Sequence, residues 1–431
     1  DDVESRGLGD VYKRQVNMFV LRQLHNKINT TVVSMSIICL MLFMTITILS
    51  SALSLNNTMR KDLEDTTPVD LNLYKTANLP ENEKMSKAQI EDSRKTMIQT
   101  LEDNGFDMTK LKDVVEIPIY ATNELTWRDT LSPVYDEVKQ QFPNLLYETA
   151  EEIVKVSDYN KIARLYGNIE YQLKDDEYII LCDFDNMKNL RNKALKADST
   201  ITIAGKEYKS KYDECQNGYI YMAGSHINNG IVLVPDSCNL TEDMKEETFL
   251  AANYNATTEE EKEEIEKICT GETETEFSKN LNEKDITIDG MTKIAIIESS
   301  LGVSTIVLFI AIYLGIIFLI ASSAILALKQ LTESSDNKQR YAILRKIGAD
   351  EKMIKGALFK QIGIFFLMPL ILAIIHSIFG IQFVMTMMSV LADAKELLPS
   401  AIATAVIIGV IYGAYFMATY LGSKNIIKEA E

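Results

Sequence analysis

The sequence predicts a membrane protein with four transmembrane α-helices and a large extracellular α+β domain inserted between helices 1 and 2. Two observations support this fold class. Four long stretches contain no charged residue, and the negative charge of the chain is concentrated in one segment between them. The chain has 431 residues, 47% of them hydrophobic, and a formal net charge of −17. These averages would suit a soluble acidic protein, so the distribution along the chain decides the class.

The first observation concerns the uncharged stretches. They are 32, 30, 32 and 27 residues long and lie between Lys27 and Arg60, Glu298 and Lys329, Lys360 and Asp393, and Glu396 and Lys424. About 20 apolar residues are enough for a helix to cross a bilayer. Buried core helices of a soluble protein are the alternative, but they seldom extend so far without a charge. We therefore expect transmembrane helices within 31–55, 291–330, 358–380 and 400–423.

The second observation is the position of the acidic residues. Residues 56–290 contain 27 Lys and Arg and 48 Asp and Glu, which gives a net charge of −21, and the remainder of the chain has a net charge of +4. The acidity therefore belongs to the domain between helices 1 and 2. A nucleic-acid partner is excluded, because binding to phosphates requires a basic surface.

Basic residues near the spans predict the orientation. Eight Lys and Arg residues lie from position 329 to position 360, whereas the segment 381–399 contains only Lys395. The positive-inside rule places segments rich in Lys and Arg in the cytoplasm. We therefore expect an N-terminal segment (16–30), a coupling loop (331–357) and a tail (424–431) in the cytoplasm. The domain at 56–290 and the loop at 381–399 are expected outside.

The first 15 residues are a separate case. The chain begins with Asp1, and residues 9–15 resemble translated sequencing-adapter sequence. We expect residues 1–15 to be non-native and the remainder to be the C-terminal piece of a longer protein. A genuine polar N-terminal arm is the alternative.

Periodicity predicts helices and strands in the domain at 56–290. Helical patterns cover 83–103, 150–165 and 258–269, of which the first stops at Asn104-Gly105 and the last opens with a capping box at Thr258. The glutamates of the last helix are expected to form a solvated face, although they could attract cations. Short alternating or β-branched runs predict strands at 114–120, 178–182, 200–204, 219–223 and 231–234.

Four of the five cysteines lie in this domain, and Cys39 lies in the first span. Oxidation is permitted outside the cytoplasm, and four cysteines allow three pairings. Free thiols are the favoured alternative, because a domain of about 235 residues can bury its own core. The sequence leaves open the disulfide state of Cys182, Cys215, Cys238 and Cys269.

The second apolar stretch belongs to a helix longer than a bilayer is thick. No proline interrupts residues 291–331. Forty helical residues extend about 60 Å, against about 30 Å for the hydrocarbon core. We expect this helix to extend outwards as a stalk that carries the extracellular domain, and the first span to do the same through 54–64.

The coupling loop predicts a short amphipathic helix along the inner membrane surface. Tyr341, Leu344 and Ile347 recur every three residues and form an apolar face together with Ile343. Basic side chains occupy the remainder. A simple interfacial helix that binds anionic lipid headgroups is the alternative.

The ends of this helix also have sequence signals. Ser335 or Asp336 can cap its start. Gly348 suits its end, and Asp350 can cap the helix that follows and enters the third span.

The run Arg340–Ala349 resembles the signature loop of FtsX-like ABC-transporter permeases. In that family a short helix that ends in a Leu/Arg-rich turn and Gly-Ala docks on the ATP-binding subunit. The resemblance covers about 300–425, and the order of one span, an outer domain and three spans extends it over 16–431. Within the family, the chain most resembles the C-terminal half of bacitracin- and lantibiotic-resistance permeases, with macrolide-exporter permeases more distant. The family often has an acidic residue where this chain has 340–342, so a salt bridge to the ATPase is not carried over.

The resemblance implies a non-catalytic permease subunit or half-subunit in a bacterial plasma membrane. ATP hydrolysis by a separate cytoplasmic ABC ATPase, a dimer, would move the coupling helix. The stalks would pass this motion to the extracellular domain, for export of or resistance to antimicrobial peptides or drugs. The implied ATPase-coupling residues are Arg340, Tyr341, Ile343, Leu344, Arg345, Lys346, Ile347 and Gly348.

Partners and cofactors follow from the same resemblance. The partner ATPase would use ATP and Mg, and this chain would bind no cofactor itself. The remaining N-terminal permease half or a second permease copy would complete the assembly in the lipid bilayer, together with a sensor kinase. The alternative function is an FtsX-type signalling or scaffold protein that regulates a sensor kinase or a cell-wall hydrolase.

The motifs agree with a chain that is not itself an enzyme. The sequence contains no G-x-x-x-x-G-K-[ST] loop for ATP phosphates, no H-E-x-x-H metal motif and no G-x-S-x-G elbow. His226 is expected in a turn and not as a catalytic base. His376 is expected to be a neutral group hydrogen-bonded inside the helix bundle, although an ionisable residue within a membrane is a functional candidate by default. A membrane-anchored ectoenzyme is accordingly disfavoured, and no metal site is predicted.

The fourth span has small residues four positions apart, at Ala401, Ala405, Gly409 and Gly413. Small residues at this spacing allow helix backbones to approach closely. We expect the face of Ala405, Gly409 and Gly413 to pack on another span, in the N-terminal permease half or in a second copy. A span that is merely rich in small residues is the alternative.

Overall fold

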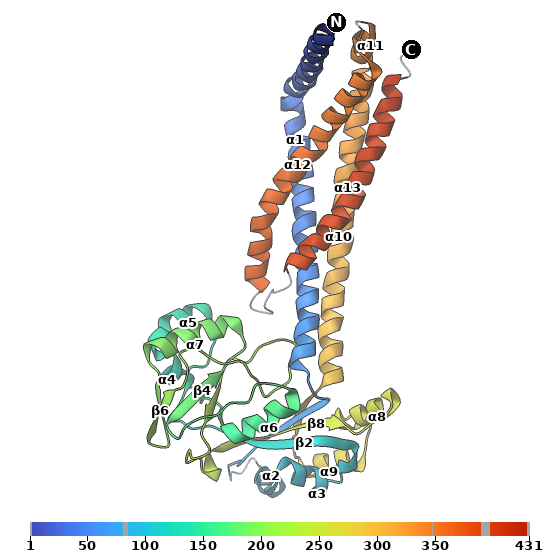
Figure 1. The fold of residues 1–431 in the computed structure, drawn as a ribbon. Helices are drawn as coiled ribbons and strands as arrows, with labels where there is room; N and C mark the ends of the chain where they lie inside the picture. The colour runs from blue at the N-terminus through green and yellow to red at the C-terminus, as the bar shows by residue number, and fades with distance from the viewer. Residues whose placement is uncertain (1, 81–84, 347, 389–396, 429–431) are drawn as a thin grey trace. The chain divides into compact units, whose positions relative to one another are not determined.

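The computed structural model describes residues 2–80, 85–346, 348–388 and 397–428, with side chains from residue 32 onward. The chain divides into two compact units, whose boundaries fall inside helices α1 and α10. The unit Met59–Gly302 is called the α/β domain below. The unit that contains the long helices is called the helix bundle (Figure 1).

Four long helices and one short helix supply the bundle. They are α1 (Asp2–Thr66), α10 (Lys293–Asp336), α11 (Lys338–Lys346), α12 (Glu351–Met388) and α13 (Leu397–Lys428). Four stretches are long and apolar enough to cross a membrane: Val32–Thr66, Lys293–Asp336, Glu351–Met387 and Leu397–Lys428. The predicted four spans, with an α/β region between the first and second, are therefore confirmed for the described part of the chain. Which side of the membrane each end faces stays a prediction.

The helices that flank the α/β domain are continuous over more residues than a bilayer requires. Helix α10 has 44 residues and α1 extends to Thr66. The backbone of residues 2–15, predicted as non-native, continues α1. Pro369 lies within α12.

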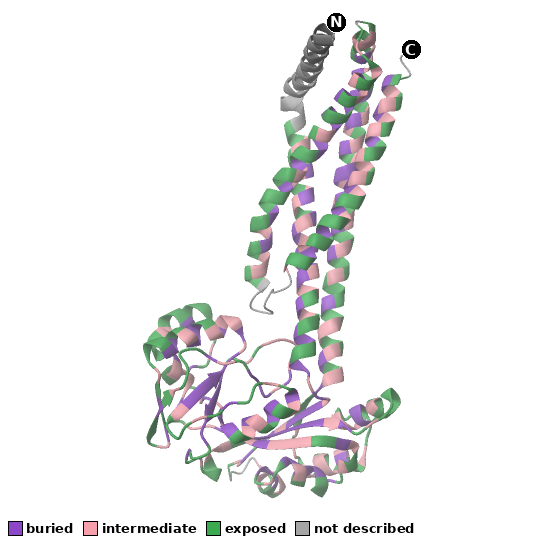
Figure 2. Cartoon of the chain, in the orientation of Figure 1, coloured by how far each residue is buried: buried purple, intermediate pink, exposed green. Residues whose placement is uncertain are grey.

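An apolar core holds the bundle together. Ile38 of α1, Leu319 of α10 and Phe366 of α12 belong to one buried cluster with Tyr412 of α13, whose hydroxyl donates to the Phe366 carbonyl at 2.8 Å. Large apolar side chains such as Phe309 are exposed. Exposed positions recur along the long helices (Figure 2). Helices that are apolar all round are typical of membrane spans.

The α/β domain is built on a mixed nine-stranded sheet in the order β5-β6-β4-β7-β3-β2-β8-β1-β9. Pairs β3/β7 and β4/β6 are parallel and the others are antiparallel. The strands are β1 (Leu71–Thr76), β2 (Leu111–Tyr120), β3 (Ile153–Lys155), β4 (Glu177–Leu181), β5 (Thr200–Ile203), β6 (Lys206–Ser210), β7 (Ile231–Val234), β8 (Lys245–Tyr254) and β9 (Asp289–Thr292).

Helices cover both faces of this sheet. Alternate residues of a strand point to opposite faces, so one strand can contribute to the cores on both sides. On β8, Phe249 and Ala251 join a core with α6 (Val156–Tyr166), whereas Leu250 and Ala252 join a core with α3 (Met97–Asp103). A third core lies around β4 and β7. The remaining helices are α2 (Lys87–Ser93), α4 (Trp127–Leu131), α5 (Tyr135–Gln141), α7 (Asp185–Ala197), α8 (Glu259–Cys269) and α9 (Glu276–Lys284).

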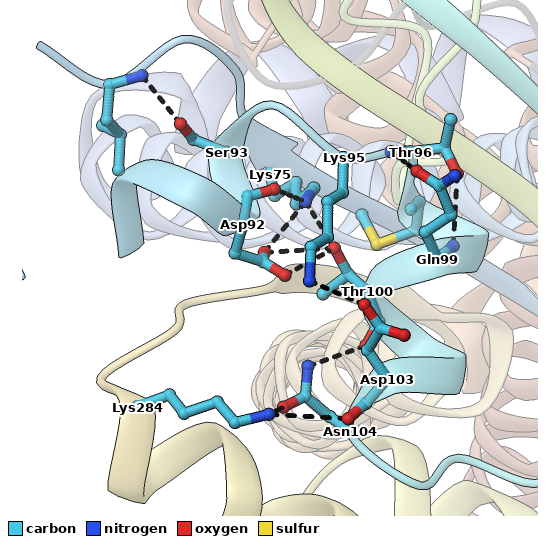
Figure 3. Close-up of polar contacts among 12 residues, drawn as sticks. Lys75, Asp92, Ser93, Lys95, Thr96, Gln99, Thr100, Asp103, Asn104 and Lys284 are labelled. Atoms are coloured by element: carbon cyan, nitrogen blue, oxygen red, sulfur yellow. Dashed lines mark hydrogen bonds and ion pairs between the residues drawn. The ribbon is translucent and has the colours of Figure 1, made fainter. Parts of the chain in front are cut away.

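A buried polar network fastens α2 and α3 to the sheet. Figure 3 shows Lys75 of β1 and Asp92 of α2 pointing toward each other, with Thr100 of α3 beside them. The Lys75 Nζ lies 2.9 Å from Asp92 Oδ2 and donates to Thr100 Oγ1 at 2.5 Å. Desolvation lowers the pKa of Lys75, and the carboxylate of Asp92 opposes that shift. Each of these two buried charges thus has an oppositely charged partner and hydrogen bonds, which offset the cost of removing a charge from water.

Several sequence predictions in this domain are confirmed. Strands β2, β4, β5 and β7 lie where strands were predicted. Gly105 has a φ of 85° and follows the C-cap Asn104, so the predicted helix stop is present. Thr258 forms the predicted capping box with Glu261.

Two helix predictions are wrong in part. The single helix expected over 83–103 is two helices in its described part, because Thr96 opens α3 with a capping box to Gln99. The helix expected over 150–165 starts only at Val156. Before it, the β-branched residues of β3 pair with β7 in the interior of the sheet, which favours a strand.

The strand expected over 219–223 is absent, and the segment is irregular. Side chains satisfy its backbone in place of a neighbouring strand. The Tyr166 hydroxyl donates to the Ile220 carbonyl at 2.7 Å, and the Met222 N–H donates to Asn72 Oδ1 at 2.7 Å. The sequence alternates as a strand would, but these partners lie more than 50 residues away.

The five cysteines are free thiols in the structure. Cys182, Cys215 and Cys238 are buried, and Cys39 and Cys269 are half-buried. Burial raises the pKa of Cys269 to about 12, with the carboxylate of Glu266 adding to the shift.

Candidate functional site

Helix α11 lies between the second and third spans and begins and ends at clear signals. Asn337 separates it from α10, and the Tyr341 N–H donates to the Asn337 carbonyl at 3.1 Å. The start is therefore at Asn337, and the predicted starts Ser335 and Asp336 are wrong, because α10 continues to Asp336.

The end of α11 agrees with the sequence. Gly348 has a φ of 92°, a conformation that glycine adopts without strain. Its N–H donates to the Arg345 carbonyl, and the Ala349 N–H donates to the Leu344 carbonyl, both at 3.0 Å. These are the bonds of a glycine-terminated helix. The carbonyl of Asp350 then accepts the first bonds of α12, as predicted.

Three of the predicted coupling residues anchor α11 to the bundle. Tyr341 is buried, and its hydroxyl donates to Gln361 Oε1 of α12 at 2.9 Å. Leu344 packs against the apolar core of the bundle. The guanidinium of Arg345 lies 2.5 Å from Glu351 Oε1 and donates to the Ile427 carbonyl of α13 at 2.8 Å. The short helix is thus tied to both helices that follow it.

The other described coupling residues face outwards. Arg340, Ile343 and Lys346 are exposed and lie three residues apart, so they share one face of α11. Ile343 is 58% exposed although it is apolar. Gly348 is also exposed, and Ile347 lies outside the described residues. The predicted coupling residues that lie within α11 therefore divide into an anchoring face and an exposed basic–apolar face.

The small-residue face of α13 does not pack on the described part of this chain. Ala405 and Gly409 are exposed, and a Cβ added to Gly409 or Gly413 would meet no described atom within 4 Å. The packed face of α13 carries Thr404, Ile408 and Tyr412 instead. Packing of the small-residue face on another span stays a prediction.

The two described histidines have different surroundings. His226 has a carboxylate partner, because its Nδ1 lies 2.9 Å from Oδ2 of the buried Asp183. The sequence did not indicate this partner, because Asp183 lies 43 residues away from His226. His376 is hydrogen-bonded, as expected, but to the Leu372 carbonyl of its own helix, and it is exposed and not inside the bundle.

A second candidate site lies wholly within the α/β domain. A cavity of about 920 Å³ is bordered by the irregular segment 219–231 and by residues of β1, β8 and β9. Asp183 and Glu152 also line it. Among the described residues, no group of three or more His, Cys, Asp and Glu side chains is arranged to hold a metal ion.

Comparison with known families identifies the bundle. The family described as FtsX-like permease C-terminal matches residues 315–430, which contain the second half of α10 and all of α11, α12 and the described α13. This segment is an FtsX-like permease domain. The resemblance read from the α11 residues is therefore confirmed for residues 315–430.

Curated relatives agree with this assignment. The chain is 38% identical over 108 residues to the bacitracin export permease protein BceB of Bacillus subtilis (strain 168), a match that covers 25% of this chain and 16% of the relative. It is 33% identical over 124 residues to BceB of Halalkalibacterium halodurans, which covers 28% and 18%.

A longer match extends into the α/β domain, because it has more residues than the helix bundle. The uncharacterized ABC transporter permease YvcS of Bacillus subtilis is 22% identical over 302 residues, which is 69% of this chain and 44% of the relative. The matches thus span less than half of the length of these relatives.

Proposed function

We propose that this chain is the membrane subunit, or half-subunit, of an ABC transporter in which a separate ATPase hydrolyses ATP. The exposed face of α11 carries the proposal. Arg340 and Lys346 flank the exposed Ile343, and this pattern suits a partner surface that has an apolar pocket with an acidic rim. The anchors Tyr341 and Arg345 would pass a displacement of this face to α12 and α13.

The proposed location is a bacterial plasma membrane, with both termini and α11 in the cytoplasm and residues 56–290 outside. The concentration of basic residues around α11 supports this orientation. ATP and Mg would bind to the partner ATPase dimer. The N-terminal permease half or a second permease copy, and a sensor kinase, would complete the assembly.

The proposed activity is export of, or resistance to, antimicrobial peptides or drugs. Two relatives are named as bacitracin export permeases, which supports this class of substrate. Helices α1 and α10 contribute residues to both units of the chain. They are therefore the elements through which motion at α11 would reach the α/β domain.

The test is ATPase coupling in a reconstituted complex. The chain would be co-expressed with an ABC ATP-binding subunit, purified into nanodiscs and assayed for ATP hydrolysis. Ile343→Glu combined with Arg340→Glu is expected to abolish complex formation. Lys112→Glu, a charge reversal at an exposed lysine of β2, is the matched control and should leave the complex intact.

A second variant separates docking from transmission. Leu344→Ala removes an anchor without changing the exposed face, so the ATPase should still bind but respond less to the membrane subunit. A complex that forms equally well after reversal of the α11 face would contradict the proposal. Recovery of a cell-wall hydrolase or kinase partner, with no ATPase, would favour the signalling alternative.

A further inference from the structure

The charged residues that line the cavity in the α/β domain are acidic. Among the described residues, its lining contains three acidic residues, Glu152, Asp183 and Glu247, and no lysine or arginine. The surrounding segment 56–290 contains 27 lysines and arginines, so basic residues are available in the domain but absent from this surface. The lining therefore presents a negative potential to whatever enters it.

Two of these carboxyl groups have no cationic partner. Neither Glu152 nor Glu247 forms an ion pair with a described residue, whereas the adjacent Glu151 is paired with Arg191 at 2.9 Å. Glu247 accepts a hydrogen bond from the Tyr221 hydroxyl at 2.7 Å. Burial raises the pKa of each carboxyl to about 7, and their mutual repulsion adds to the shift of Glu152. A cation between them would relieve that repulsion.

Aromatic rings stand beside the same carboxyl groups. Tyr221 packs edge-on against Tyr74, with ring centroids 5.8 Å apart, and against Phe249 at 5.2 Å. Both tyrosines line the cavity. Carboxylates together with aromatic faces are the usual surroundings of a bound ammonium or guanidinium group.

The border of the cavity is apolar and exposed. Leu146, Ile227 and Met291 line it and are 76%, 53% and 42% exposed. Apart from them, the exposed large apolar side chains of the described α/β domain are Ile169 and Tyr212. Exposed apolar residues gathered at one opening are typical of a binding surface.

We propose that this cavity binds an amphipathic cationic molecule, whose ammonium or guanidinium group lies between Glu152 and Glu247 and whose apolar part covers Leu146, Ile227 and Met291. The proposal rests on the proposed function, because it names the chemistry that an exported or sensed molecule would have. The volume of about 920 Å³ accommodates a few side chains of a peptide, not a folded protein.

The chain contains its own reporter for this site. Trp127 is its single tryptophan and lines the cavity. The full chain in nanodiscs of zwitterionic lipid would be titrated with a short peptide of alternating Lys and Leu, while Trp127 fluorescence is recorded. The same peptide with Gln in place of Lys is the neutral probe, and empty nanodiscs correct for binding to lipid. The cationic peptide should change the fluorescence at a much lower concentration than the neutral one.

Three single substitutions and one double variant test which side chains contact the peptide. Glu152→Gln and Glu247→Gln should each weaken binding of the cationic peptide by roughly tenfold, and the double variant by more. Leu146→Ser should weaken binding of both peptides. Glu214→Gln, at an exposed carboxylate paired with Lys196, is the control and should change neither. An unchanged thermal midpoint and unliganded Trp127 spectrum would show that each variant is folded.

The pH dependence of peptide binding is an independent test. Lowering the pH from about 8 to about 6 protonates both carboxyls and should weaken the cationic peptide only. The charged and titratable groups that face them are Glu151, Glu246, Asp289 and Tyr221, and Asp183 with His226 lies on the same cavity or beside it. The double Gln variant should lose this pH dependence.

Two results would overturn the proposal: equal affinity for both peptides, or a double variant that binds the cationic peptide as the unmodified chain does. This assay contains no ATPase. Its failure would therefore leave the α11 docking test standing, and failure of that docking test would not alter the peptide result.

Discussion

The α/β domain and the helix bundle differ in how some of their buried polar groups are satisfied. In the α/β domain, the buried charges Lys75 and Asp92, and Glu151 and Arg191, meet each other. In the bundle, α1 buries a row of hydroxyls that have no hydrogen-bond partner among the described residues: Thr47, Ser50, Ser51, Ser54 and Thr58.

The difference reflects what each unit must resist. A buried ion pair that loses one partner leaves an uncompensated charge, so the α/β domain is held in a single arrangement. A neutral hydroxyl without a partner costs less, and small side chains let helices approach closely. The α1 interface is therefore held by packing, and it has fewer specific bonds to break when helices shift.

The largest expected effect is on the paired charges. Glu151→Ala leaves the guanidinium of Arg191 buried, with 1% of its side chain exposed. Because that charge loses its partner, we expect the free energy of unfolding of the α/β domain to fall by about 3–5 kcal/mol. Thermal unfolding of the full chain, followed by Trp127 fluorescence, would measure it.

The control for this variant is an exposed pair. Glu137→Ala breaks the pair with Lys193, whose side chains are 49% and 56% exposed, and should cost about 0–1 kcal/mol. Equal effects of the two variants would show that the buried pair has no special role.

The next effect concerns packing in the bundle. A Cβ added to Gly380 would lie 2.7 Å from the Phe43 ring and 2.9 Å from Thr47 Oγ1 of α1. Gly380→Leu should therefore destabilise the bundle by about 1–3 kcal/mol through overpacking. Gly363→Leu, on the same helix with no described atom within 4 Å, should be tolerated. Loss of the helical circular dichroism signal on heating in detergent would compare them.

A smaller effect is the dependence of stability on pH. The carboxyls of Glu152 and Glu247 have a pKa of about 7 in the folded domain, against about 4.3 in an unfolded chain. The folded state holds more protons between these values, so these groups make the domain less stable as the pH rises from about 5 to about 8. The thermal midpoint of the unmodified chain should therefore fall, relative to that of its double Gln variant, as the pH rises from about 5 to about 8. A difference that is constant with pH would refute it.

The smallest effect is local to α11. Arg345→Ala removes bonds to Glu351 and to the Ile427 carbonyl, worth about 1 kcal/mol together because the side chains are partly exposed. Amide hydrogen exchange within Lys338–Lys346 should become faster while the thermal midpoint hardly changes. Lys346→Ala, at an exposed position, should leave the exchange rates as they are.

The bundle was the more predictable of the two units. Lipid tolerates few charges, so uncharged stretches located the four spans directly. In the α/β domain, strand β8 was missed although it lies in the interior of the sheet, because its glutamates, alanines and asparagine are poor strand formers. Pairing with β1 and β2 on either side determines it. Helix α7 had a usable signal, since Met187, Leu190 and Ala194 share one buried face.

The sequence predicted α11 as a helix, but it did not predict which of its side chains are anchored and which are exposed. The apolar period of α11 predicted the helix, and Gly348 its end. It did not show that Arg345 is an anchor, because its partner carbonyl lies 82 residues away at Ile427. The cavity was hidden for the same reason, since Glu152 and Glu247 approach each other only in the folded sheet.

The ends of the α/β domain lie on neighbouring strands. Leu71, at the start of β1, pairs with Thr292, at the end of β9, so the chain enters and leaves the sheet at adjacent positions. A domain whose ends are this close can be inserted into a host chain at a single point. Recombination of one contiguous gene segment could therefore exchange the whole α/β domain, while the sequence that encodes the FtsX-like domain stays unaltered. Under changing selection, the two parts of such a gene can evolve at different rates.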